Sequence, residues 1–91
     1  MTILTLIPRP TAGFQAQTLE NEVVLLHPIQ NVIIYLNTSG ALVWSLCNGK
    51  RSVAEIIELL VAVYPESEKD IRADVQHIVQ ELMGRGALTA A

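Results

Sequence analysis

The sequence predicts an α+β domain in which a three-stranded antiparallel sheet is followed by three helices, a winged helix-turn-helix-like arrangement. Two observations predict it. Runs rich in β-branched and aliphatic residues lie at residues 22–26 and 32–36 and are separated by turn-forming residues. After them, three residues suited to capping helices each precede an apolar stretch with helical spacing, and glycine or proline ends each stretch.

The sheet is expected to be a meander of residues 14–19, 22–26 and 32–36. Its first strand is a weak signal, because larger and polar residues only loosely alternate there, whereas EVVLL and VIIYL are strong strand sequences. Both faces of these two stronger strands are apolar, although a strand with one solvated face should alternate. We therefore expect the helices to cover one face, and a partner to meet the other face or the open edge.

Three helices are predicted from residue 37 onward. Asn37 or Thr38 supplies the cap of the first helix, which stops at Gly49. Ser52 and Glu55 form a capping box, S-x-x-E, that opens the second helix. The residues of this second helix that we expect to face the core are Ile56, Leu59, Leu60 and Val63.

The third helix is predicted to begin at a Ser67 cap and to end at Gly84. Its apolar stripe consists of Ile71, Val75, Ile78, Val79 and Leu82. Residues 85–89 are expected to form a short wing-like extension. Before the sheet, residues 1–13 are expected to form a flexible arm without regular structure, because Pro8 and Pro10 restrict the backbone there. The chain then divides into this arm and one domain, residues 14–91.

Composition and charge narrow the function. Hydrophobic residues make up 51% of the 91-residue chain, which indicates exposed apolar surface and hence a partner. The net charge of −3 argues against a nucleic-acid ligand, and the third helix is itself predominantly acidic. A single cysteine fits a reducing compartment, and the chain has neither a membrane-spanning stretch nor a signal-peptide pattern. We therefore expect a cytoplasmic protein.

A catalytic or metal-binding role is not expected. Cys47 follows apolar residues late in a helix, which is typical of a small core residue rather than a nucleophile. His27 and His77 lack neighbouring ligands at metal-binding spacing and are both expected to face solvent. The sequence contains no glycine-rich phosphate loop and no nucleophile-turn motif. The chain is thus expected to be a binding protein without a metal or cofactor of its own.

Three sequence blocks resemble one known family. They are LNTSGALVW at residues 36–44, NGKRSVAEI at residues 48–56 and IRADVQHIVQELMGRG at residues 71–86. Together they resemble the PqqD-like domains, which are recognition elements for ribosomally synthesised and post-translationally modified peptides (RiPPs). The resemblance covers residues 14–88, and the blocks occur in the family's order and spacing.

The resemblance implies where a peptide binds. In this family the leader segment of a precursor peptide adds as a strand beside the third strand, in a groove whose other wall is the third helix. Carried over by position, the strand wall is Val32, Ile33, Ile34 and Tyr35, and the helix wall is Ile71, Arg72, Val75, Gln76 and Val79. Arg72 is expected to pair with an acidic side chain of the leader. Asp74 matches the family's aspartate, for which a structural role is favoured over a peptide contact.

The resemblance also implies a function. The chain is expected to be a stand-alone recognition element that holds the leader and presents the precursor to a separate modifying enzyme. In the PqqD-like branch that partner is commonly a radical S-adenosylmethionine enzyme with iron–sulfur clusters. Two alternatives remain open: a recognition element for a lasso-peptide leader peptidase, and a homodimeric interaction scaffold that carries no peptide.

Overall fold

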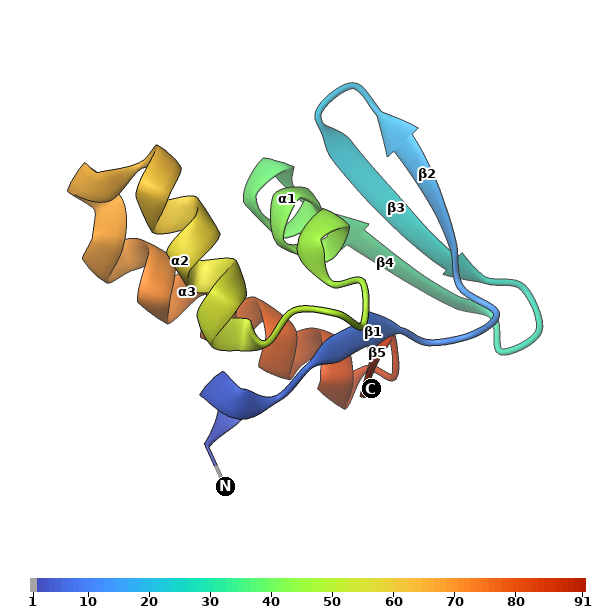
Figure 1. Ribbon diagram of the computed structural model, residues 1–91. Coiled ribbons are helices and arrows are strands. Elements are labelled where there is room, and N and C mark those ends of the chain that lie inside the picture. The colour runs from blue at the N-terminus through green and yellow to red at the C-terminus, as the bar shows by residue number, and fades with distance from the viewer. Residues whose placement is uncertain (1) are drawn as a thin grey trace.

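The computed structural model describes residues 2–91, and its central feature is an antiparallel sheet with the strand order β2-β3-β4. The strands are β2 (Gln15–Leu19), β3 (Glu22–His27) and β4 (Val32–Leu36). Three α-helices follow in sequence and lie to one side of the sheet (Figure 1). The α+β class and the predicted order of sheet and helices are confirmed.

The two faces of the sheet differ in what covers them. On the inner face, Leu25, Ile34 and Leu36 are buried in the core, and helix α1 (Thr38–Leu46) packs against β3 and β4. On the outer face, Ile33 is 51% and Tyr35 is 77% exposed. Within the described residues, the helices thus cover one face, and the apolar side chains of β4 on the other face remain in solvent.

Local capping explains where two of the helices begin. The Asn37 side-chain oxygen accepts a hydrogen bond from the Gly40 N–H at 2.9 Å at the start of α1. Helix α2 (Val53–Val63) opens on the predicted capping box, in which the Ser52 N–H donates to Glu55 Oε1 at 2.8 Å and the Glu55 N–H donates to Ser52 Oγ at 3.2 Å. Hydrogen bonding to the Ser52 N–H, and then to the Ser52 side chain, lowers the pKa of the Glu55 carboxyl group.

The third helix, α3 (Glu68–Gly84), begins differently from the prediction. Ser67 occupies the capping position, but its side chain makes no capping hydrogen bond. A short 3₁₀ turn, η2 (Pro65–Ser67), leads directly into the helix, and its Pro65 carbonyl accepts a hydrogen bond from the Glu68 N–H. The turn therefore satisfies the first backbone donor of the helix without using the serine side chain. The helix ends at Gly84 as predicted.

The core lies between the sheet and the helices, and it corrects the predicted face of α2. Leu59 and Val63 were expected to be buried but are 45% and 65% exposed, whereas Val53 and Ile57 are fully buried. The sequence VAEIIELLVAV is apolar over most of its circumference, so its spacing is compatible with more than one buried face. Contact with α3 and with the N-terminal 3₁₀ turn selects the face that is buried.

The N-terminal segment was expected to be a flexible arm, but the structure packs it against the domain. A 3₁₀ turn, η1 (Ile3–Thr5), contacts α2, and strand β1 (Pro8–Pro10) pairs with β5 (Leu88–Ala90). The predicted absence of regular structure is therefore wrong for these elements, while the domain boundary at residue 14 stays a prediction. Met1 lies outside the described residues. The expected extension at residues 85–89 becomes a turn followed by β5.

Pro8 and Pro10 are compatible with β1 because an N–H group at either position would point away from β5. The carbonyl of Ile7 accepts from the Ala91 N–H and the Thr11 N–H donates to the Ala87 carbonyl, so alternate residues of this segment face β5. Pro8 and Pro10 lie between those positions, where no N–H is needed for pairing. The Pro8 carbonyl points the other way and accepts from the Gly49 N–H at 2.9 Å. The two prolines therefore do not prevent β1 from pairing with β5.

Cys47 is a core residue, as predicted. Its side chain is buried, and its Sγ donates to the Val43 carbonyl at 3.2 Å. Burial raises the pKa of the Cys47 thiol to about 12. Because a thiolate is the nucleophilic form, this environment makes the group unreactive near neutral pH.

The packing of the N-terminal segment can be tested at two adjacent residues. Leu6 packs against the core, whereas Ile7 is 37% exposed. Leu6→Ala should lower the free energy of unfolding by about 2 kcal/mol, the lower end for such truncations, because Leu6 is only partly buried. Ile7→Ala should change it by less than about 0.5 kcal/mol. Urea denaturation measures both values, and equal small effects would mean that the segment does not pack in solution.

The state of Cys47 can be tested by alkylation. At pH 8.5 the folded chain should react with iodoacetamide far more slowly than the chain in concentrated urea, because a pKa of about 12 leaves almost no thiolate. The raised pKa also predicts that stability falls as the pH rises above 9, where the unfolded thiol ionises first. Equal alkylation rates in the two conditions would contradict the buried placement.

Candidate functional site

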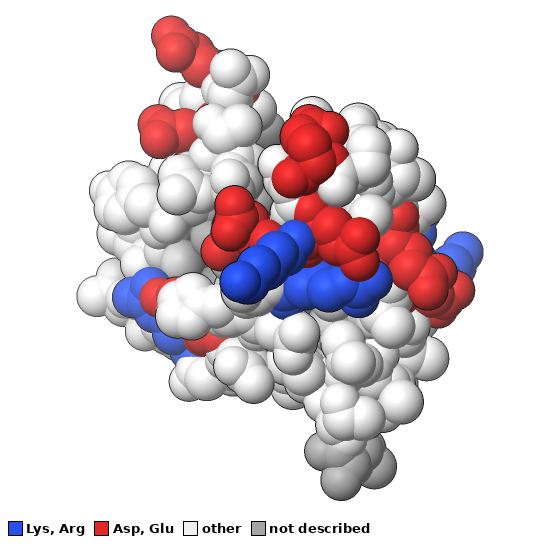
Figure 2. Space-filling model, turned by 90° about the vertical axis from the view of Figure 1, so that its left-hand side faces the viewer, with Lys and Arg blue, Asp and Glu red and all other residues white. Residues whose placement is uncertain are grey.

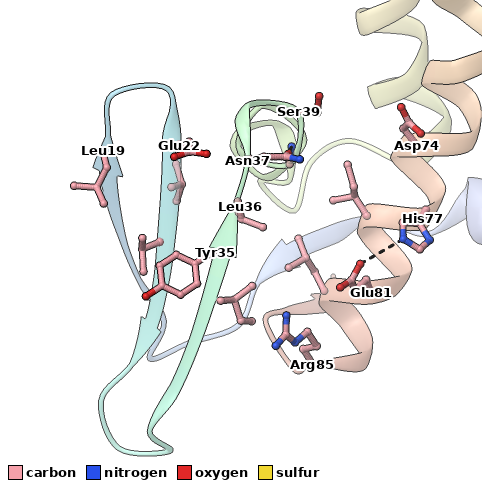
Figure 3. Close-up of a pocket in the computed structure, with 16 residues that line it drawn as sticks. Leu19, Glu22, Tyr35, Leu36, Asn37, Ser39, Asp74, His77, Glu81 and Arg85 are labelled. Atoms are coloured by element: carbon pink, nitrogen blue, oxygen red, sulfur yellow. Dashed lines mark hydrogen bonds and ion pairs between the residues drawn. The ribbon is translucent and has the colours of Figure 1, made fainter.

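A groove runs between strand β4 and helix α3. It encloses a cavity of about 660 Å³, with the first turn of α1 at one end. On the sheet side, the end of β4 and the adjoining ends of β2 and β3 line it, through Ile34, Tyr35, Leu36, Leu19, Glu22, Val23 and Val24. The helix side consists of Asp74, His77, Ile78, Glu81, Leu82 and Arg85. Figure 3 shows Glu81 and Arg85 extending from α3 toward β4, whereas Asp74 lies farther along the helix, level with Ser39. The floor of the groove is apolar and its helix-side rim is charged.

The spacing along α3 explains this arrangement. Residues three and four positions apart share one face of a helix, and the six groove residues follow that spacing from Asp74 to Arg85. Ile78 and Leu82 are the apolar members, and they pack against or belong to the core. The charged members stand at the edge of the buried stripe, where their polar ends reach solvent. Helix α3 thus contributes both floor and rim.

Strand β4 presents a free edge to this groove. It pairs with β3 on one side, and no other described strand pairs with it. The edge of a sheet carries backbone N–H and C=O groups that an additional extended segment can pair with. Neighbouring strands in a sheet lie about 4.8 Å apart, so an added strand would occupy the space between β4 and α3. The edge and the groove together are suited to bind extended peptide.

The charged groups of the rim are mostly acidic. Glu22, Asp74 and Glu81 line the groove, and Arg85 is its basic residue. His77 Nε2 lies 3.4 Å from Glu81 Oε2, and both side chains are largely exposed (Figure 3). His77 faces solvent as predicted.

The predicted strand wall is divided between the two faces of β4. Ile34 and Tyr35 line the groove. Val32 packs against the core instead, and Ile33 lies on the open outer face of the sheet. Adjacent residues of a strand point to opposite faces, so the groove meets both faces of β4 near its C-terminal end, with Ile34 on the inner face and Tyr35 on the outer face. A peptide-binding role for these residues stays a prediction.

The predicted helix wall is displaced around α3. Val75 and Val79 are buried in the core, and Ile71 and Val75 line a second, smaller cavity. Arg72 and Gln76 lie outside both cavities. The Arg72 guanidinium is 2.9 Å from Glu68 Oε2, and Gln76 Nε2 donates to the Arg72 carbonyl at 3.0 Å.

The residues that line the helix wall could have been found from the sequence. The apolar stripe of α3 marks its buried face, and the groove lies beside that face rather than on it. The flanking positions therefore line the groove, and Asp74 is among them; its predicted structural role stays a prediction. Asp74, His77 and Glu81 follow helical spacing next to Ile78, which was the available signal.

His27 is buried, which corrects the prediction that it faces solvent. Only 8% of it is exposed, and its ring meets that of Phe14 edge-to-face with centroids 5.0 Å apart. Its Nδ1 accepts a hydrogen bond from the Gln30 N–H at 3.1 Å. Gly13 approaches the ring so closely that a Cβ there would lie 2.5 Å from His27 Nε2. His27 thus fastens the β3–β4 connection and the segment before β2 to each other.

Two further structural findings concern function. Within residues 2–91, no three His, Cys, Asp or Glu side chains gather as a metal site, and no helix is long and apolar enough to cross a membrane. Figure 2 shows acidic and basic side chains intermingled on the left-hand side of the molecule in Figure 1, rather than a continuous basic surface. That face does not have the charge that binding to a phosphate backbone requires.

Known proteins are similar in sequence to this chain over part of its length. A PqqA binding protein from Rhodopseudomonas palustris (strain HaA2) is 46% identical over 46 residues, which is 50% of this chain and 45% of the relative. A PqqA binding protein from Bradyrhizobium diazoefficiens (strain USDA 110) is 41% identical over 49 residues, 54% of this chain and 48% of the relative. The chain thus matches about half the length of each of these relatives.

The fold matches a solved structure over almost the whole chain. TbiB1 in complex with the TbiA(beta) leader peptide superposes with a TM-score of 0.77, covering 91% of this chain and 96% of that chain. The two sequences are 22% identical, so this match supports the fold. Residues 22–88, which hold β3, β4 and all three α-helices, match the family described as Coenzyme PQQ synthesis protein D. The chain belongs to the PqqD family.

Proposed function

We propose that this chain is a RiPP recognition element that binds the leader of a PqqA-type precursor peptide and presents it to a separate modifying enzyme. The leader binds as an added strand in the groove between β4 and α3. One observation carries the proposal: the edge of β4 with which no described strand pairs faces α3 across a groove with an apolar floor. The relatives named as PqqA binding proteins supply the class of ligand.

The dimensions of the groove support an extended peptide as the ligand. Its volume of about 660 Å³ lies in the middle of the range of binding pockets, roughly 300–1,000 Å³. A peptide strand there would direct alternate side chains onto the floor and the rest outward beside Ile33 and Tyr35. Backbone pairing along β4 would supply affinity for many sequences, and the side chains on the floor would select among them.

The expected affinity is moderate. A strand of about six residues with two or three buried side chains gives a small interface, for which dissociation constants range from nanomolar to micromolar. Such binding suits a protein that must release its peptide after the modification. The chain's own role is then to bind and orient the peptide, and the bond-forming chemistry belongs to the partner.

We propose a radical S-adenosylmethionine enzyme as that partner, because this is the common partner in the PqqD-like branch. A leader peptidase of the lasso-peptide type is the alternative enzyme. The cytoplasm is the proposed location, since ribosomal precursor peptides are made there. Co-purification of the chain with each candidate enzyme, with and without precursor peptide, separates the two partners.

The exposed outer face of the sheet favours a second candidate function. Ile33 and Tyr35 present apolar surface that a second copy of the chain could cover, which would make the protein a homodimeric scaffold. Size-exclusion chromatography with and without a synthetic PqqA peptide tests this candidate. A persistent dimer that binds no peptide would favour the scaffold over the recognition element.

Strand addition predicts an alternating response to changes in the peptide backbone. Methylating successive backbone nitrogens of a synthetic PqqA peptide should weaken binding at every second position, because alternate N–H groups of an added strand face its neighbour. Amide chemical shifts of the protein should change most on β4 and on the groove side of α3. A response without alternation, or shifts confined to α2 and η1, would contradict strand addition at this edge.

Two arginines of α3 test which face of the helix meets the peptide. Arg85 lines the groove, whereas Arg72 pairs with Glu68 outside it. Arg85→Ala should weaken binding of the PqqA peptide by up to about fivefold, because it removes the basic group of the rim. Arg72→Ala should leave the dissociation constant within about twofold. Fluorescence polarisation measures both dissociation constants. A larger effect at Arg72 would contradict the groove face of α3 and support the helix wall that the family resemblance implies.

A further inference from the structure

A second cavity lies among the three helices. Its volume is about 280 Å³, and its apolar lining comes from Leu42 and Val43 of α1, Leu60 of α2, and Ile71 and Val75 of α3. Tyr64, which follows α2, completes the mouth. The polar groups at its edge are uncharged apart from Asp74. This cavity is suited to an apolar group.

The second cavity continues the groove. Ser39, Asp74 and Ile78 line both spaces, so only the first turn of α1 and the side chains around Asp74 lie between them. The groove occupies the C-terminal half of α3 and the cavity its N-terminal half. A chain leaving the end of β4 along α3 would therefore pass directly over the mouth of the cavity. Figure 3 shows Ser39 and Asp74 at this end of the groove.

The size and the rim of the cavity favour a side chain as its occupant. A volume of about 280 Å³ is at the small end of ligand pockets, which range over roughly 300–1,000 Å³. Leu42 and Tyr64 at the mouth are 41% and 47% exposed, and a side chain entering between them would remove that apolar surface from water. One aliphatic or aromatic side chain fits this combination better than a separate ligand.

We propose that this cavity is an anchor subsite for the leader peptide. It takes one aliphatic or aromatic side chain from the segment immediately beyond the residues that pair with β4. The inference rests on the proposed function, and it adds a second, apolar determinant of specificity outside the strand-binding groove. It also gives Ile71 and Val75 a place in peptide recognition as the inner wall of the subsite.

The position of the subsite links the place of the anchor residue in the peptide to the orientation of the bound strand. The cavity adjoins residues 38 and 39, just past the C-terminal end of β4. A peptide antiparallel to β4 would carry its anchor before the strand-paired segment, and a parallel peptide would carry it after that segment. Locating the anchor in the peptide therefore determines the orientation of the bound strand.

Two leucines of similar exposure provide the test. Leu42 stands at the mouth of the cavity, whereas Leu59 of α2 is 45% exposed and lines neither space. Leu42→Lys should weaken binding of a fluorescein-labelled synthetic PqqA peptide by about tenfold or more, because it places a charge where the anchor enters. Leu59→Lys should stay within about twofold. Both sites are partly exposed, and thermal denaturation confirms that each variant is folded.

An alanine scan of the same peptide locates the anchor. At one apolar residue of the peptide, outside the strand-paired segment, truncation to alanine should lower the affinity for the wild-type protein. The same truncation should lower the affinity for Leu42→Lys only slightly further, since both changes remove the same contact. Equal affinities of the Leu42→Lys and Leu59→Lys variants, with binding otherwise intact, would overturn the subsite and leave the proposed function standing. Failure of the wild type to bind the peptide would overturn both.

Discussion

The packing of α1 against the inner face of the sheet is the contact on which the rest of the site depends. This helix contacts β3 and β4 on one side and α3 on the other, so it separates α3 from the edge of β4. Its start is fixed by the Asn37 cap and by Gly40, where an added Cβ would lie 3.4 Å from the Asn37 side-chain oxygen and 3.5 Å from Leu36. A displaced α1 would let α3 close onto the strand and remove the groove.

Local sequence signals predicted the fold well. The Ser52–Glu55 capping box and the Asn37 cap depend on neighbours within four residues, so each can be recognised without tertiary information. The buried face of α2 could not be chosen in this way, because its sequence is apolar nearly all round and the contacts that select a face come from α3 and the N-terminus. The pairing of β1 with β5 likewise joins residues from opposite ends of the chain.

The candidate site was predicted in part. The resemblance to the PqqD-like family implied a groove between β4 and α3, but the helix wall carried over from it includes buried residues such as Val79. An apolar stripe shows which residues of a helix are buried, and the residues that flank the stripe line a groove beside the core. The burial of His27 was missed for another reason: it depends on Phe14 and on a close approach by Gly13, neither of which has a pattern in the local sequence.

The pairing of β1 with β5 has a consequence for tethering. Because Pro8 lies opposite Ala90, the C-terminal end of the chain lies beside β1, whereas the N-terminal end lies beyond η1, which contacts α2 (Figure 1). An enzyme joined to one end would thus be attached at a different place from an enzyme joined to the other. The effective concentration of bound peptide at that enzyme's active site would then depend on the choice of terminus as well as on linker length and stiffness.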